Sequence, residues 1–152
     1  MFRGDSMEKI THTGGKIFFT ILIISIISYL YFTILPLNDI SIYIGYIFSI
    51  VYFWINFYTG FRTNLNLKES ILVGIIGSGM GLFLLFFALY TEIVVQNSDV
   101  ALWIIKPYFI PTMSLVQSIF NHITIIYPII LIIINICLVV IGSITRKIMH
   151  KI

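Results

Sequence analysis

The chain has 152 residues, of which 59% are hydrophobic and only 10% are charged. Soluble globular proteins average about 45–50% apolar and about 25% charged residues. This composition therefore excludes a soluble enzyme, a disordered chain and a disulfide-rich secreted domain. The net charge is +3, and the sequence contains no long run of basic residues that would suggest binding to nucleic acid. The sequence instead predicts an all-α polytopic membrane protein, with residues 1–152 forming a single integral membrane domain.

Four apolar stretches have the length of about 20 residues that a membrane-spanning helix needs. The predicted spans cover approximately residues 17–35, 40–58, 71–90 and 123–144. The first of them exceeds the apolar core of about 7–15 residues found in secretory signals. It also ends without a small-residue cleavage site, so we expect it to remain as an anchor.

The basic residues predict an orientation for this four-span arrangement. An even number of spans puts both termini on one side, and of the nine Lys and Arg residues only Lys106 falls on the other side. Cytoplasmic loops carry an excess of Lys and Arg. We therefore expect a multi-pass protein of the cell membrane whose N- and C-termini are cytoplasmic. The residues on the cytoplasmic side are Arg3, Lys9, Lys16, Arg62, Lys68, Arg146, Lys147 and Lys151.

The stretch from about residue 100 to 122 is apolar but differs from the four spans. It contains Lys106, Pro107 and Pro111, and as a fifth span it would move the basic C-terminus outside. We expect an outer amphipathic helix that lies at the interface or is partly re-entrant, with a full span as the open alternative. A straight helix from Thr112 to Arg146 would measure about 52 Å at 1.5 Å per residue. We therefore expect a break or a kink, for which Pro128 is the candidate.

Polar residues in this outer stretch form the best candidate for a site. They recur at intervals of three and four residues, which places them on one face of a helix. Together with two charged neighbours they could line an outward-facing vestibule. The alternative is the solvated face of an interfacial helix. The six residues are Glu92, Lys106, Ser114, Gln117, Ser118 and Asn121.

Small residues cluster in the third predicted span, at Gly74, Gly77, Ser78 and Gly81. Small side chains let membrane helices approach closely, so we interpret the cluster as a helix-packing surface. An unwound helix that lines a substrate site is the alternative.

The predicted cytoplasmic loop contains Arg62 and Lys68. We interpret both as topology signals that contact lipid, with a docking loop for a partner as the alternative.

The centres of the predicted spans contain no charged residue. Asn56 and Asn135 are their notable polar groups, and interhelical hydrogen bonds are the expected role of both. The Cys, His, Asp and Glu residues show no metal-ligand spacing, and Cys137 is the single cysteine. We therefore expect no catalytic residue, no metal and no cofactor, and a protein that is not an enzyme.

The leading functional hypothesis is a non-catalytic accessory or structural subunit of a membrane complex. Its partners would be the lipid bilayer and either another membrane protein or further copies of this chain. The alternative is a small oligomeric transporter or pore with an outer polar vestibule. A third possibility is an immunity-type or lysis-type membrane protein.

Overall fold

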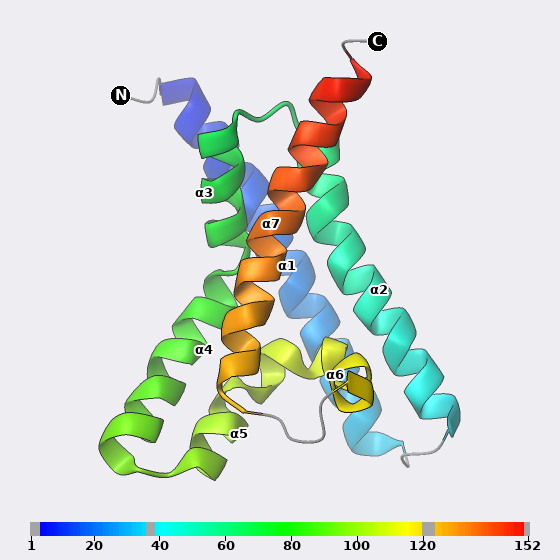
Figure 1. The fold of residues 1–152 in the computed structure, drawn as a ribbon, viewed down its shortest axis with the longest axis vertical. Coiled ribbons are helices and arrows are strands. Elements are labelled where there is room, and N and C mark those ends of the chain that lie inside the picture. Colours follow the sequence, from blue (N-terminus) through cyan, green and yellow to red (C-terminus); the bar gives the residue numbers. More distant parts are fainter. Residues whose placement is uncertain (1–3, 36–38, 120–123, 151–152) are drawn as a thin grey trace.

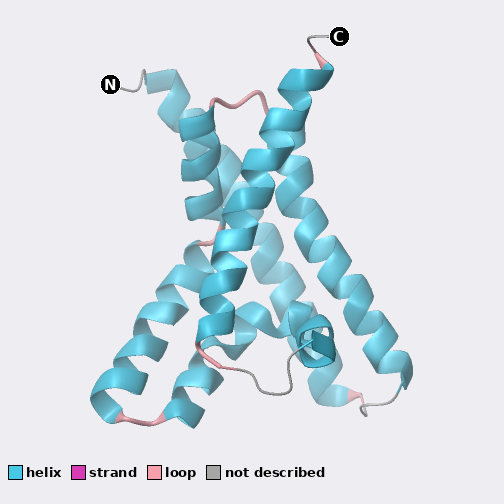
Figure 2. Cartoon of the chain, in the orientation of Figure 1, coloured by secondary structure: helices cyan, strands magenta, loops and turns pink. Residues whose placement is uncertain are grey.

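The computed structural model describes residues 4–35, 39–119 and 124–150, and these residues are almost entirely helical (Figures 1 and 2). No strand occurs in the described ranges. The elements in chain order are α1 (Gly4–Ile34), α2 (Asp39–Arg62), α3 (Leu67–Gly77), α4 (Gly79–Tyr90), the π-helical turn η1 (Thr91–Val95), α5 (Ser98–Phe109), the 3-10 turn η2 (Ile110–Thr112), α6 (Met113–Ile119) and α7 (Ile126–Met149).

Four helices are long and apolar enough to cross a membrane: Ser6–Ile34, Asp39–Arg62, Ser98–Ile119 and Ile126–Met149. A fifth candidate is the pair Leu67–Gly77 and Gly79–Val95, whose halves are bent by 58°. The structure therefore confirms an all-helical chain with membrane-length apolar helices. The helices α1, α2 and α7 continue beyond the predicted spans into polar sequence, since apolarity marks only the part of a helix suited to hydrocarbon.

Both chain termini lie at the same end of the molecule, together with the loop between α2 and α3 (Figure 1). We call this the terminal end. The opposite end, which we call the far end, contains the last turn of α1, the first turn of α2 and the connection between α4 and α5 (Figure 1).

Local polar contacts shape the connections at both ends. At the terminal end, the Glu69 carboxylate accepts the Asn66 N–H at 2.8 Å as α3 begins. At the far end, Gln96 adopts a left-handed conformation with φ 54°, and Asn97 then caps α5.

Residues 98–119 enter the bundle from the far end and reverse direction inside it. The ring of Tyr108 lies against Gly81 of α4, and Tyr52 of α2 is its edge-on neighbour. Farther along the chain, Ser49 donates to the Pro111 carbonyl at 3.0 Å. Next, Ser114 meets Gly45, nearer the start of α2. The order of these contacts shows that α5 rises to the middle of α2, and that η2 and the start of α6 then turn back along α2 toward the far end.

We call the segment formed by α5, η2 and α6 the re-entrant hairpin. The expectation for this stretch left an interfacial, a partly re-entrant and a spanning arrangement open, and its contacts place it inside the bundle, while by length and apolarity Ser98–Ile119 also qualifies as a span. Ala101, Ile105 and Tyr108 are completely buried. Pro107 and Pro111 lack the N–H groups that a continuous helix would use, which favours a change of direction here. Pro128 does not provide the expected kink, because it lies in the first turn of α7, where a missing N–H costs nothing.

The third predicted span is also interrupted, although we expected one helix over residues 71–90. The bend lies at Ser78, whose ψ of 9° departs from helical geometry between Gly77 and Gly79. The Ser78 N–H still bonds Gly74, and its carbonyl accepts from Leu82 at 3.0 Å. These bonds satisfy the backbone in an apolar interior, where an unpaired group would cost several kcal/mol.

Glycines set the closest approaches between helices. A Cβ at Gly60 would overlap the carbonyl of Val139, and one at Gly142 would overlap the carbonyl of Phe57, so α2 and α7 touch through their backbones. Sequence reasoning did not single out this pair. Of the glycines that it did select, Gly74 faces the Ile136 Cα, where a Cβ would lie at 2.9 Å.

The remaining members of the predicted packing cluster meet side chains. A Cβ at Gly77 would lie 2.6 Å from the Ile17 side chain, and one at Gly81 would overlap the ring of Tyr108. Ser78 is buried at the bend between them. This cluster therefore contacts three different elements within the chain, namely α1, α5 and, through Gly74, α7.

We predict that Gly142→Ala lowers the free energy of unfolding in detergent micelles by about 2 kcal/mol, because the new methyl group meets backbone that cannot rotate away. Gly15→Ala is the matched control, since a Cβ there meets nothing within 4 Å. The control should raise stability by about 0.5–1 kcal/mol, because alanine restricts the unfolded chain. Equal effects of the two substitutions would contradict the α2–α7 contact.

Candidate functional site

Four buried side chains form a polar cluster in the middle of the bundle, which we call the central polar cluster. It consists of Tyr52 and Asn56 from α2, Tyr108 from α5 and Asn135 from α7. The Asn135 amide donates to the hydroxyls of both tyrosines at 2.9 Å. Its carbonyl oxygen accepts from Asn56 at 3.3 Å. The expected interhelical bonding of the two asparagines is present and also includes the re-entrant hairpin.

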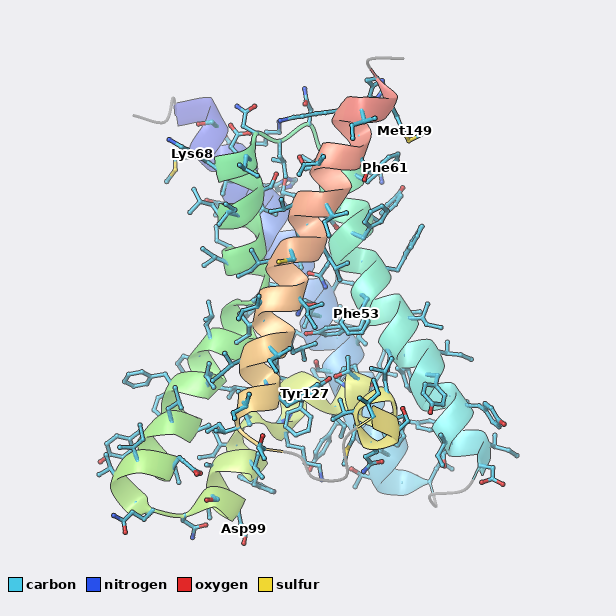
Figure 3. The ribbon with its side chains drawn as sticks, viewed as in Figure 1. Phe53, Phe61, Lys68, Asp99, Tyr127 and Met149 are labelled. Atoms are coloured by element: carbon cyan, nitrogen blue, oxygen red, sulfur yellow. The ribbon has the colours of Figure 1, made fainter. Side chains whose placement is uncertain are left out.

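The central polar cluster has further support from neighbouring groups. Asn56 also donates to the carbonyl of Tyr52 at 3.0 Å. The Tyr52 and Tyr108 rings pack edge-to-face with centroids 6.3 Å apart. The buried hydroxyl of Ser78 faces Tyr108 without reaching hydrogen-bond geometry. Nearer the far end, Thr112 and Tyr127 join their hydroxyls at 2.6 Å, which ties η2 to α7 (Figure 3). The bonds of Tyr108 and Thr112 therefore attach the turn of the hairpin to α7.

Beside the returning limb of the hairpin lies a cavity of about 360 Å³, which we call the far-end cavity. Its size is at the lower end of the range of about 300–1,000 Å³ typical of small-molecule sites. Apolar side chains form most of its wall, and three polar groups and one cation complete it. The lining residues are Tyr29, Phe32, Thr33, Ile42, Lys106, Ile110, Met113, Ser114 and Gln117.

The chemistry of the far-end cavity follows from Lys106, the charged residue in its described lining. Lys106 is partly buried, and no carboxylate balances it among the lining residues that the structure describes. A cation next to apolar walls interacts more strongly with an anion than it would in open water. Gln117 offers an amide at the same cavity. The arrangement is suited to a molecule with an anionic group and an apolar body.

The structure brings together three residues of the predicted outer polar face, Lys106, Ser114 and Gln117, and separates two others. Ser118 is exposed and donates to the Leu115 carbonyl at 2.7 Å. Glu92 lies in η1, where it accepts from Ser98 at 3.0 Å. Asn121 lies outside the described residues.

Sequence reasoning did not find the part of the cavity wall that α1 contributes. The sequence does not distinguish Tyr29, Phe32 and Thr33 from other residues of an apolar span, because helical spacing identifies neighbours on one helix only. The polar Thr33 is the one possible signal, but its hydroxyl donates to the Tyr29 carbonyl within α1. Proximity between α1 and the hairpin is a property of the tertiary fold.

The two residues selected in the predicted cytoplasmic loop lie at the terminal end. Arg62 is the last residue of α2, and its backbone carbonyl accepts a hydrogen bond from Arg146 of α7. Lys68 is exposed in the first turn of α3 (Figure 3). Within the described part of the chain, no three His, Cys, Asp or Glu residues are grouped as metal ligands would be.

No protein-family model matches the chain, and neither a curated protein nor a solved structure is significantly similar to it. Functional inference for this protein therefore rests on its geometry.

We predict that Asn135→Leu destabilises the protein in micelles by about 2 kcal/mol, since three side-chain hydrogen bonds are lost at about 0.6 kcal/mol each. Ile133→Leu is the control, because this neighbour on α7 is 54% exposed and lies outside the cluster. The shift in unfolding midpoint with denaturing detergent measures both. A stability of Asn135→Leu equal to that of the control would show that the amide does not hold the hairpin.

Proposed function

We propose that this chain is a small multi-pass membrane protein that binds a small amphipathic anion in the far-end cavity. The proposal develops the vestibule of the transporter-or-pore hypothesis into a binding site. The observation that carries it is the convergence of Lys106, Gln117 and an apolar wall from α1 on one cavity. An anionic head would pair with the Lys106 ammonium, and the apolar body would lie against Phe32 and Ile110.

The distribution of charge between the two ends supports cytoplasmic termini. At the terminal end lie Lys9, Lys16, Arg62, Lys68, Arg146 and Lys147, as their places in α1, α2, α3 and α7 require. Asp39, Glu92 and Asp99 lie at the far end (Figure 3). By the positive-inside rule, this distribution favours a cytoplasmic terminal end, with the far-end cavity on the outer side of the cell membrane.

Orientation can be measured by cysteine labelling in a Cys137→Ala background. Lys68 and Ser98 are exposed and lie at opposite ends, so each accepts a cysteine without disturbing the core. With a membrane-impermeant maleimide on intact cells, we expect the Ser98→Cys variant to be labelled. The Lys68→Cys variant should react only after permeabilisation. The reverse pattern would invert the orientation and place the far-end cavity in the cytoplasm.

Binding can be tested with octanoate, whose ten heavy atoms suit a cavity of about 360 Å³. In nanodiscs, we expect Lys106→Gln to weaken octanoate binding at least tenfold, because a charge-assisted hydrogen bond contributes about 1.5–3 kcal/mol. Gln117→Leu should weaken it less. Ser118→Ala is the control, because Ser118 follows Gln117 on α6 but does not line the cavity. Equal affinity of the Lys106 and Ser118 variants, or equal binding of neutral octanol, would contradict the proposed site.

A second observation favours the accessory-subunit hypothesis. A largely apolar groove of about 630 Å³ lies between α1 and α3–α4, where Gly15 and Gly79 are among its lining residues. Open space over Gly15 would let the backbone of a partner helix approach closely. A partner of this kind should co-purify after mild detergent extraction and be lost from the Gly15→Leu variant. Purification of the native chain without any partner would contradict this function.

A further inference from the structure

At the terminal end, α1, α2 and α7 surround a second cavity of about 560 Å³, which we call the basic cavity. Its lining includes four cationic side chains: Lys9 and Lys16 from α1, Arg62 from α2 and Arg146 from α7. Most of its other lining groups are hydroxyls or amides, and among the described residues none of the lining groups is a carboxylate. The cavity therefore has an uncompensated positive charge, which an anion would neutralise.

Two of the four cations are held in place by the chain itself. Lys9 donates to the carbonyl of Asn64, and Arg146 donates to the carbonyl of Arg62. Both carbonyls lie at the C-terminal end of α2, where the helix dipole favours positive charge. These two bonds position the cations before any ligand arrives. The head groups of Lys16 and Arg62 have no hydrogen-bond or ion-pair partner within the described ranges, and Arg146 retains further N–H donors.

The donor set matches a phosphate group. A guanidinium presents paired N–H groups that bind phosphate oxygens in a bidentate manner, while lysine supplies a compact point charge. Two arginines and two lysines from three helices can surround one phosphate from several sides. Basic pockets between transmembrane helices on the cytoplasmic side are known to bind anionic lipid headgroups.

Aromatic rings next to the basic cavity indicate that the phosphate belongs to a lipid. Tyr58 lines the cavity and also stacks on Trp54, with ring centroids 6.2 Å apart. Phe57 and Phe61 stack in the same way along α2, and Phe61 lies near the terminal end (Figure 3). Trp54 is 58% exposed on the outer surface of the bundle. Trp and Tyr side chains favour the headgroup level of a bilayer, so Trp54 and Tyr58 favour a position of the cavity at the depth of lipid phosphates.

We propose that the basic cavity binds the phosphate of an anionic lipid, whose acyl chains lie along the exposed face of α2 around Trp54. Arg62 and Lys16 contact the phosphate directly, and Lys9 and Arg146 close the cavity from the loop side. This site requires insertion in a membrane but is independent of anion binding in the far-end cavity. Failure of the octanoate experiment would leave it unaffected.

Native mass spectrometry of the full chain tests the proposal after extraction from bilayers of phosphatidylglycerol and phosphatidylcholine. The native chain should retain phosphatidylglycerol in preference to phosphatidylcholine. The Lys16→Gln/Arg62→Gln variant should retain at least about tenfold less, given the contribution of each basic residue near anionic lipid. Lys68→Gln/Lys147→Gln is the matched control, because it removes the same charge from the same end outside the basic cavity. Its retention should equal that of the native chain.

Equal losses in the two double variants would show general surface attraction and overturn the site. Displacement of the lipid by millimolar inorganic phosphate would identify a site for a free anion and overturn the lipid assignment. A second measurement needs no variant: phosphatidylglycerol with a photoreactive headgroup should crosslink the native chain within residues 9–16 or 58–64, or at Arg146. Crosslinks confined to other regions would also overturn the proposal.

Discussion

The amide of Asn135 is the interaction on which the rest of the structure depends. It joins α2, α5 and α7 at one depth by bonding Tyr52, Tyr108 and Asn56. A re-entrant segment in an apolar bundle needs such an anchor, because apolar packing alone gives no driving force that distinguishes protein from lipid tails. Without these bonds, the buried hydroxyls of Tyr52 and Tyr108 would lose their Asn135 donor, and α5 would lose its polar attachment to α7 at this depth.

The position of the hairpin in turn determines where the cavities form. Its returning limb descends beside α2, because Gly45 leaves room for Ser114 and Ser49 bonds the Pro111 carbonyl. Lys106 and Gln117 are thereby turned toward α1 at the far end. At the terminal end the glycine contact holds α2 against α7, and α1 packs on α3 through Gly14 and Gly77. The basic cavity lies between α1 and the α2–α7 pair.

The two cavities differ in a way that follows from their charges. The far-end cavity has one cation and a mainly apolar wall, which suits a small molecule with one anionic group. The basic cavity has four cations next to a row of aromatic rings, which suits a phosphate at the bilayer surface. In the described residues these cavities are separated by the central polar cluster, whose members donate to and accept from one another. One end is therefore suited to a ligand and the other to the surrounding lipid.

Much of the architecture was predictable from the sequence alone. Apolar runs located α1, α2 and α7, because hydrocarbon-length helices have a strong one-dimensional signature. The spacing of Ser114 and Gln117 indicated a shared helical face, and Asn56 and Asn135 stood out as polar residues within apolar spans. Only the tertiary structure decided four other features. They are the break at Ser78, the return of the hairpin, the contribution of α1 to the far-end cavity and the pairing of Gly60 with Gly142. Each of these depends on which distant surfaces meet, and helical periodicity reports the faces of a helix but not the surface that each face will contact.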